Sequence, residues 1–206
     1  MSRITEQESF WEGDFGDEYV GRNQGAGYVA ANVALFSRAL ASTRNVSNIL
    51  ELGSNVGMNL LALKSLLPAV KLSAVEINEK AASELCLNIP EVGLYLDSIL
   101  DFRPEETWDL VFTKGVLIHI NPDQLSRIYD LMYQASSRYL LIAEYYNPHP
   151  VEVMYRGHVG KLFKRDFAGE MLDRFQDLNL VDYGFVYHRD SNFPQDDLTW
   201  FLMEKK

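Results

Sequence analysis

A strand–loop–helix signature around residue 50 constrains the fold of this chain more than any other feature. An apolar run at 49–52 leads into the small-residue loop GSNVG and then, from residue 58, into an apolar pattern with helical spacing. Gly53 can adopt a positive φ and has no Cβ, so a ligand can approach the backbone closely. The N–H groups at the start of the helix are free to donate to a ligand. We therefore expect a ligand site here, with the carboxylate of Glu51 directed into it.

The glycine spacing in this loop separates two kinds of ligand. A dinucleotide-binding loop has the pattern G-x-G-x-x-G, whereas this loop has Asn55 in place of the middle glycine. A close approach of a pyrophosphate is therefore disfavoured. The remaining pattern, E-x-G-x-x-x-G, ends at Gly57, which lets the first helical turn pack tightly on the strand. A tight strand–helix turn without any ligand is the simpler alternative.

Composition limits the classes of protein to which the chain can belong. Its 206 residues suit one domain of ordinary size, 1–206. The net charge of −10 argues against a nucleic-acid-binding surface, which needs a basic stripe. Cys86 is the only cysteine and the histidines lack metal-ligand spacing, so we expect neither a disulfide nor a metal. The sequence shows no secretory signal and no membrane span, which predicts a cytoplasmic protein.

The N-terminal segment 1–27 is polar and glycine-rich, yet it contains four large aromatic residues between positions 10 and 19. A disordered tail would not contain so many large aromatic side chains. One interpretation is a cap that covers one edge of the core. The other is a lid over a bound ligand, with Tyr19, Arg22 and Asn23 facing the site.

Further along the chain, buried strands alternate with helices. Apolar runs predict strands at 71–75, 92–96, 108–115 and 138–145, and two closing strands at 180–187 and 198–204. The alternation predicts an α/β fold, in which a mostly parallel, doubly wound sheet has helices on both faces and ends in an antiparallel hairpin. In such folds the ligand binds outside the carboxyl ends of the strands.

Four polar residues stand at these predicted strand ends: Glu51, Glu76, Asp97 and Lys114. Glu76 lies about 20 residues past the glycine loop, where an acidic residue holds a ribose diol in such folds. Two adjacent hydroxyls are a bidentate donor, and a carboxylate is the matching acceptor. The alternative for Glu76 is an exposed residue that caps the next helix.

The segment 146–165 is the longest stretch without a periodic pattern after the sheet is established. A loop of this length in a compact domain is usually functional. It follows the fifth strand and is rich in cations, which suggests that it binds an anionic group of a small-molecule substrate. A solvated or internally paired basic patch is the alternative.

Several motifs together identify a resemblance. ELGSNVGMNL, AVEINEKA, LDSILDF and WDLVFTKGVLIHI occur in the order and spacing typical of class I S-adenosylmethionine-dependent methyltransferases. The segments FWEGDFGDEYVGRN and EYYNPHPVEVMYRGHVGKLFKRDFAGE look like the pseudaminic acid biosynthesis-associated methylases, small bacterial proteins associated with nonulosonic sugar pathways. The first resemblance implies a Rossmann-like fold with a seven-stranded sheet.

The resemblance also implies a cofactor, S-adenosyl-L-methionine, and the residues that hold it. They are Tyr19, Arg22, Glu51, Gly53, Ser54, Asn55, Gly57, Met58, Asn59, Glu76, Ile77, Asp97, Ser98, Ile99, Lys114, Gly115 and Val116. Asp97 would accept from the adenine amino group, although an ordinary turn aspartate is the alternative. The substrate is expected to be a sugar or nucleotide sugar with an anionic group, bound by Tyr146, Asn147, Arg156 and Lys161.

The implied reaction is an in-line displacement at the methyl group, which needs no metal and in some cases a base. The candidate bases are His119, Tyr145 and His158. His119 has an unperturbed pKa near neutrality, and the alternative for it is to orient its loop. Other functions stay open: a methyltransferase for a natural product or peptide, an NAD-dependent oxidoreductase, and a non-catalytic scaffold. The sequence does not give the oligomeric state.

Overall fold

A computed structural model describes residues 5–22 and 24–206 of the chain. The main sheet contains β1 (Asn48–Leu52), β2 (Lys71–Glu76), β3 (Gly93–Leu96), β4 (Trp108–Lys114), β5 (Ser136–Glu144), β8 (Leu178–Val186) and β9 (Leu198–Lys205). The α-helices are α1 (Glu6–Glu12), α2 (Asp14–Tyr19), α3 (Ala26–Ala39), α4 (Met58–Leu66), α5 (Glu79–Asn88), α6 (Leu125–Ala135) and α7 (Phe167–Arg174). Two short 3₁₀ helices, η1 (Leu117–His119) and η2 (Pro122–Gln124), follow β4.

The sheet has the predicted topology. Its strand order is β3-β2-β1-β4-β5-β9-β8, and every neighbouring pair from β3 to β5 is parallel. Strand β9 runs antiparallel to both β5 and β8. The expected seven-stranded, mostly parallel sheet with a closing antiparallel hairpin is therefore confirmed. Its order reverses between β1 and β4, which places the ligand crevice of such sheets at that point.

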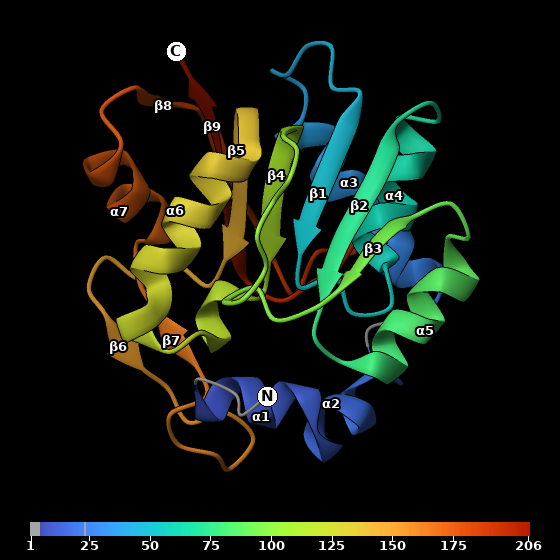
Figure 1. The fold of residues 1–206 in the computed structure, drawn as a ribbon, viewed down its shortest axis with the longest axis vertical. Coiled ribbons are helices and arrows are strands. Elements are labelled where there is room, and N and C mark those ends of the chain that lie inside the picture. Colours follow the sequence, from blue (N-terminus) through green and yellow to red (C-terminus); the bar gives the residue numbers. More distant parts are fainter. Residues whose placement is uncertain (1–4, 23) are drawn as a thin grey trace.

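Alternating strand residues divide the core between the two faces of the sheet, as the pleat requires. On β1, Ile49 belongs to the core that α3, α4 and α5 cover, whereas Leu50 and Leu52 belong to the core beneath α6 and α7. Figure 1 shows these two helical layers on opposite sides of the sheet. Both faces are apolar, so the strands read as nearly continuous hydrophobic runs.

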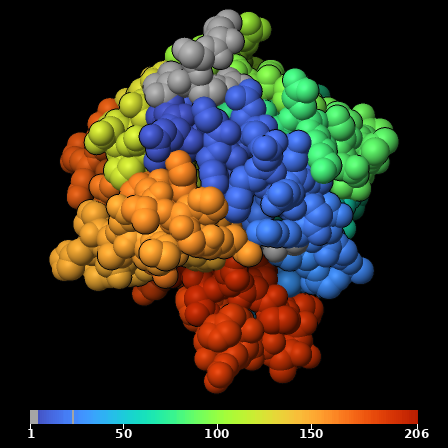
Figure 2. All heavy atoms as spheres, turned by 90° about the horizontal axis from the view of Figure 1, so that it is seen from below, coloured from blue at the N-terminus to red at the C-terminus, as the bar shows by residue number. Residues whose placement is uncertain are grey.

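The carboxyl edge of the parallel strands is covered by segments distant in sequence. The arrowheads of β1, β2, β4 and β5 point toward α1 and α2 in Figure 1. From that side, the N-terminal helices lie beside the 146–165 segment and the turn between β8 and β9 (Figure 2). Helix α1 begins with a capping box, in which the Thr5 side chain accepts from the Glu8 N–H and Glu8 reaches back to the Thr5 N–H.

The segment 146–165 is more ordered than its sequence suggests. It contains a two-stranded antiparallel sheet of β6 (Val151–Glu152) and β7 (Phe163–Lys164) and a tight turn closed by two hydrogen bonds between Tyr155 and His158. Each of these strands is too short to show an alternation of apolar and polar residues, so the sequence carries no periodic pattern there. Among the described residues, every helix is too short or too polar to cross a bilayer.

Candidate functional site

A cavity of about 740 Å³ opens at the carboxyl edge of the sheet, where the strand order reverses. We call its sheet side the floor, which consists of the loops that follow β1, β2, β3 and β4. We call the opposite side the cover, which consists of α1–α2, the tight turn after β6 and the β8–β9 turn. The lining includes Gly53 and Glu76 from the floor, and Trp11, Tyr155 and Gln195 from the cover. A cavity of this size suits a ligand the size of a nucleoside or larger.

The glycine loop of the floor has the close backbone approach that its sequence predicts. Gly53 has φ of +79°, and its N–H donates to the Val75 carbonyl at 2.8 Å. A Cβ on Gly53 would lie 2.7 Å from a methyl carbon of Val116, so only glycine fits. Gly57 serves packing against α5, because a Cβ there would lie 2.3 Å from Leu85. The loop thus joins the ends of β1, β2 and β4 at one point.

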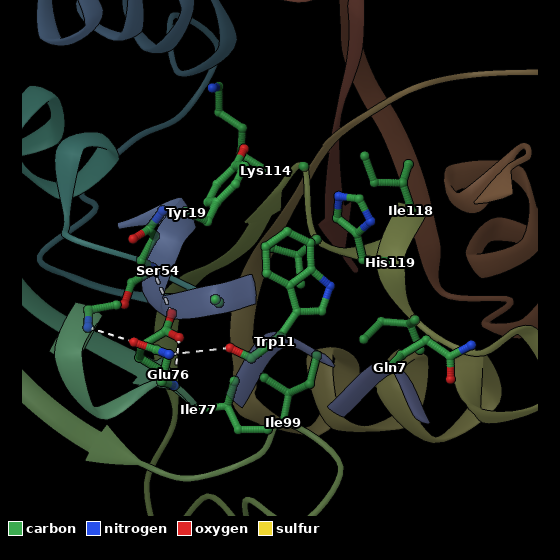
Figure 3. Close-up of a pocket in the computed structure, with 18 of the residues that line it drawn as sticks. Gln7, Trp11, Tyr19, Ser54, Glu76, Ile77, Ile99, Lys114, Ile118 and His119 are labelled. Carbon is green, nitrogen blue, oxygen red and sulfur yellow. Dashed lines mark hydrogen bonds between the residues drawn. The ribbon is translucent and has the colours of Figure 1, made fainter. Parts of the chain in front are cut away.

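Glu76 ends β2 with its carboxylate at the cavity wall. Its Oε2 accepts from the Asn55 N–H at 2.7 Å, and its Oε1 accepts from the Asn78 N–H at 2.9 Å. Burial raises the pKa of Glu76, and these backbone donors oppose that rise. Figure 3 shows the side chain between the loops that follow β1 and β2. Each carboxylate oxygen has a second lone pair, so the group can still accept from a ligand hydroxyl.

Behind the glycine loop lies a buried acidic side chain. Glu51 is fully buried, and its Oε1 accepts from the Asn59 amide at 2.6 Å. Burial raises the pKa of Glu51 to about 8, although the Asn59 hydrogen bond and the Lys114 charge oppose the rise. Glu51 itself does not line the cavity; it acts there through Asn59, which does.

Several buried acceptors around this loop lack a donor within the described part of the chain. On residues that line the cavity they are Ser54 Oγ, Asn55 Oδ1 and Asn59 Oδ1. A buried polar atom without a partner costs about 1–3 kcal/mol, so a ligand with N–H groups would satisfy what the protein leaves open. The Asn55 and Asn59 amide oxygens only accept and so do not suit a phosphate, whereas the Ser54 hydroxyl can also donate.

At the other end of the floor, Asp97, Ser98 and Ile99 line the cavity after β3. The Ser98 hydroxyl donates to a Glu8 carboxylate oxygen of α1, and its oxygen accepts from the Leu100 N–H at 3.1 Å. Glu8 is buried by this contact. Helix α1 is therefore attached to the floor beside the loop that ends β3.

The loop after β4 is held by a second buried acid. Glu144 ends β5 and accepts from the Val116 and Leu117 N–H groups, each at 3.0 Å. Burial raises the pKa of Glu144 to about 7, against the effect of these donors. Lys114 points to α3, where its ammonium lies 3.3 Å from the Tyr28 hydroxyl and 5.1 Å from the ring centroid.

His119 lies at the cavity wall as a buried, neutral side chain. Its Nδ1 is 2.6 Å from the Lys161 carbonyl, and because a carbonyl only accepts, Nδ1 carries the proton. Burial lowers its pKa to about 4. The ring packs against Trp11, at a centroid distance of 4.7 Å (Figure 3), and against Tyr155, at 4.8 Å. His119 is an acceptor through Nε2 and is too weakly basic to hold a proton near pH 7.

The structure brings most of the predicted site residues to one cavity. Those that line it are Tyr19, Gly53, Ser54, Asn55, Met58, Asn59, Glu76, Ile77, Asp97, Ser98, Ile99, Lys114, Gly115, Val116, His119, Tyr145 and Arg156. Their individual contacts with a ligand stay predictions.

Other predicted residues lie outside the lining: Arg22, Glu51, Gly57, Tyr146, Asn147, His158 and Lys161. Lys161 instead faces Glu6 at 3.6 Å, and the Asn147 amide donates to the His149 carbonyl. The Arg22 guanidinium lies over the rings of Phe15 and Tyr19. His158 packs its ring against Phe10 and Phe15, and Tyr146 packs against Phe201 on an exposed surface. Asn23 falls outside the described residues.

Some lining residues were not predicted from the sequence. They include Gln7, Glu8, Trp11, Tyr28, Asn78, His188, Gln195 and Asp196. For Trp11 the available signal was the number of large aromatic residues in segment 1–27, which indicates that this segment packs against the rest of the protein. The β8–β9 turn carries no comparable signal, because its residues reach the cavity only through the hairpin topology. Among the described residues, no three His, Cys, Asp or Glu side chains form a metal-binding group.

Comparison with known proteins identifies the architecture. The sequence matches the profile of no known protein family and matches no curated protein. The structure resembles that of the N-methyltransferase NodS from Bradyrhizobium japonicum WM9 in complex with S-adenosylhomocysteine (SAH), with a TM-score of 0.67, 16% identity and coverage of 92% of this chain and 95% of that one. The chain has the class I methyltransferase fold.

Two further methyltransferase structures support this assignment of the fold. Magnesium protoporphyrin IX methyltransferase (ChlM) from Synechocystis PCC 6803 with bound S-adenosylmethionine (SAM) has a TM-score of 0.71, 11% identity and full coverage of both chains. The plantazolicin methyltransferase BpumL in complex with a pentazolic desmethylPZN analog and SAH has a TM-score of 0.65 and 12% identity, and the match covers 93% of this chain and 89% of BpumL.

Proposed function

We propose that the protein transfers a methyl group from S-adenosylmethionine to a small acceptor. The observation that carries the proposal is the set of partnerless buried acceptors around Gly53, beside the Glu76 carboxylate. A ribose diol and a primary ammonium both donate hydrogen bonds, and S-adenosylmethionine carries both. An NAD-dependent oxidoreductase would instead need donors here for a pyrophosphate. The two amide oxygens, Asn55 Oδ1 and Asn59 Oδ1, therefore add to the absent middle glycine as an argument against a pyrophosphate at this loop.

Each part of the cofactor has a group of residues that suits it. We assign the ribose hydroxyls to Glu76 and the border of the adenine to Asp97, Ser98 and Ile99, all of which line the cavity. We assign the methionine ammonium to Asn59, whose amide donates to Glu51 and whose Oδ1 is left to accept. When bound, the cofactor supplies an electrophilic methyl group on a positively charged sulfur. The protein's part is to orient the acceptor and to exclude water from the site.

One residue of the cover, Arg156, suits the binding of an anionic acceptor. Arg156 lines the cavity and occupies a tight turn with φ of +51°, a conformation that favours Asn or Gly. An arginine held in this conformation points to a role for its side chain. Its guanidinium lies 5.6 Å from the Tyr155 ring centroid. Arg156 suits a carboxylate or phosphate, in line with the expected sugar or nucleotide sugar of the nonulosonic acid type.

The same floor is also compatible with another class of acceptor. BpumL is a plantazolicin methyltransferase and ChlM a magnesium protoporphyrin IX methyltransferase, so the same fold accommodates acceptors other than sugars. A natural-product or peptide acceptor would use the aromatic rings of the cover and would not require Arg156.

Residues 5–22 of the N-terminal segment cover the cavity, and we propose that ligands enter when these residues move aside. A cytoplasmic location stays a prediction.

Calorimetric titration tests the cofactor assignment directly. SAH should bind the wild-type protein with micromolar affinity, whereas NADH should give no heat of binding. Binding of NADH in place of SAH would overturn the proposed function and leave the fold unchanged.

The acceptor assignment has its own test. Arg156→Ala should raise the KM for an anionic acceptor about 10- to 100-fold, because a charge-assisted hydrogen bond is lost. The affinity for SAH should stay unchanged. An unaltered KM would favour the natural-product or peptide alternative.

A further inference from the structure

The β8–β9 turn contains a histidine–aspartate pair whose histidine lines the cavity. His188 Nδ1 lies 2.9 Å from both carboxylate oxygens of Asp197, and the His188 backbone N–H donates to Asp197 Oδ1 at 3.0 Å. A carboxylate only accepts, so Nδ1 carries the proton. In the neutral imidazole the lone pair is then on Nε2. An aspartate that fixes the tautomer of a histidine in this way is the arrangement by which enzymes orient a general base.

Neighbouring contacts fix the turn that carries this pair. The Gln195 amide donates to the Ala31 carbonyl of α3 at 2.7 Å, and the Tyr145 hydroxyl donates to Asp196 at 2.7 Å. Three consecutive residues, 195 to 197, therefore each bind a different part of the structure. Gln195, Asp196 and His188 all line the cavity. In Figure 2 the turn stands at the carboxyl edge, next to the N-terminal helices.

The bases expected from the sequence are less suitable than His188. His119 has a pKa of about 4, because it is buried. The Tyr145 hydroxyl already donates a hydrogen bond to Asp196, and burial together with that carboxylate raises the Tyr145 pKa far above neutrality. His158 does not line the cavity. The side chain of His188 is 53% exposed, so it can pass a proton to bulk water.

We propose that His188, oriented by Asp197, is the general base that deprotonates the methyl acceptor, an inference that rests on the proposed function. A lone pair of the acceptor O–H or N–H group forms the new bond to the methyl carbon. The carbon–sulfur bond breaks, and its electron pair stays on sulfur, which becomes a neutral thioether. The acceptor proton moves to His188 Nε2 and then to water. A base is needed for a hydroxyl or an amine and not for a carboxylate, so the inference narrows the acceptor to those two groups.

The tautomer of His188 tests the geometry without any acceptor. Nitrogen-15 NMR of histidine-labelled protein in the SAH complex distinguishes a protonated ring nitrogen from a bare one, and His188→Gln identifies the signal. We expect the neutral form of His188 to carry its proton on Nδ1. In Asp197→Asn the population should shift toward the Nε2–H form. A neutral wild-type His188 protonated on Nε2 would overturn the proposal.

Turnover provides the second test. The probes are S-adenosylmethionine labelled in its methyl group with a panel of hexosamines, uronic acids and their uridine diphosphate esters. With any acceptor that is methylated, kcat should fall about 10²- to 10⁴-fold in His188→Gln. The drop in Asp197→Asn should be similar or smaller, and KM should change little in both. Arg189→Gln, an exposed neighbour outside the cavity lining, is the matched control.

The outcomes separate this inference from the proposed function. If kcat of His188→Gln stays within about twofold of the wild-type value, His188 is not the base. If no probe is methylated, the tautomer measurement decides alone. Titration of SAH into wild type and both variants should give equal affinities. Absence of SAH binding to the wild type would contradict the proposed function itself, whatever the tautomer of His188.

Discussion

The floor and the cover of the cavity are built in different ways. In the floor the hydrogen-bond donors are main-chain N–H groups: the Gly53 N–H donates to the Val75 carbonyl, and two backbone N–H groups donate to the Glu76 carboxylate. In the cover the donors are side-chain amides. The Asn78 amide donates to Asp17 of α2 at 2.8 Å, and the Gln7 amide donates to the Gly160 carbonyl at 2.9 Å.

This difference separates a general function from a specific one. Main-chain contacts at strand ends depend on the fold, so proteins with different acceptors can share the floor. Side-chain contacts depend on individual residues and can change without altering the sheet. We therefore assign cofactor binding to the floor and acceptor selection to the cover.

The largest expected effect comes from a matched pair of glycine substitutions. Gly53→Ala in the floor combines a positive φ with a contact to Val116, and it should lower the free energy of unfolding by about 2–4 kcal/mol. Gly16→Ala in the cover would place a Cβ 1.8 Å from the Trp11 carbonyl, which forces α1 and α2 apart. Gly16→Ala should therefore make residues 5–22 accessible to proteolysis.

Urea denaturation and limited proteolysis measure the two effects separately. The free energy of unfolding should fall less in Gly16→Ala than in Gly53→Ala, because the cover contributes little to the sheet. A larger loss in Gly16→Ala would show that the cover is part of the main folding unit and would remove the distinction between the two regions.

The buried acid of the floor predicts a dependence of stability on pH. Burial raises the Glu51 pKa from 4.5 to about 8, so the folded state binds this proton more tightly than the unfolded state. The resulting stability is fully present below pH 4.5 and is lost as the pH rises through about 8. Between these values, the free energy of unfolding of wild type relative to Glu51→Gln should fall by up to about 1.4 kcal/mol per pH unit.

Denaturant titrations at several pH values test this slope. Glu84→Gln, on an exposed position of α5, is the matched control and should follow the wild type. A wild-type curve parallel to that of Glu51→Gln would show that Glu51 does not titrate in this range.

The smallest expected effect concerns the tight turn after β6, which is part of the cover. Arg156→Asn replaces a residue at positive φ by one that adopts it more readily, so the free energy of unfolding should rise by about 0.5 kcal/mol. The same variant should lose affinity for an anionic acceptor. Thermal denaturation measures the first change. A lower melting temperature would mean that the Arg156 contact with Tyr155 outweighs the strain.

The sequence predicted the floor well, because local patterns specify it. Gly53, Glu76 and Asp97 each follow an apolar strand, and parallel strands bring their carboxyl ends to one edge. Glu51 was expected in the crevice, but it lies behind Asn59 because its side chain turns into the core covered by α3 and α4. Strand alternation alone does not show how far a long side chain reaches.

The cover was predicted only in part, because its geometry depends on contacts between distant segments. The aromatic residues of α1 and α2 signalled burial but not their partners. Lys161 was expected to face a substrate, yet it pairs with Glu6. His188 was not predicted at all, since its place at the cavity follows from β8 running parallel to β5 through the antiparallel β9.

The most direct test of the division between floor and cover is calorimetric titration of SAH into three proteins: wild type, Glu76→Ala and Arg156→Ala. We predict micromolar binding to the wild type, at least tenfold weaker binding to Glu76→Ala, and unchanged binding to Arg156→Ala. Equal losses in both variants, or a loss in Arg156→Ala alone, would contradict the assignment of the cofactor to the floor.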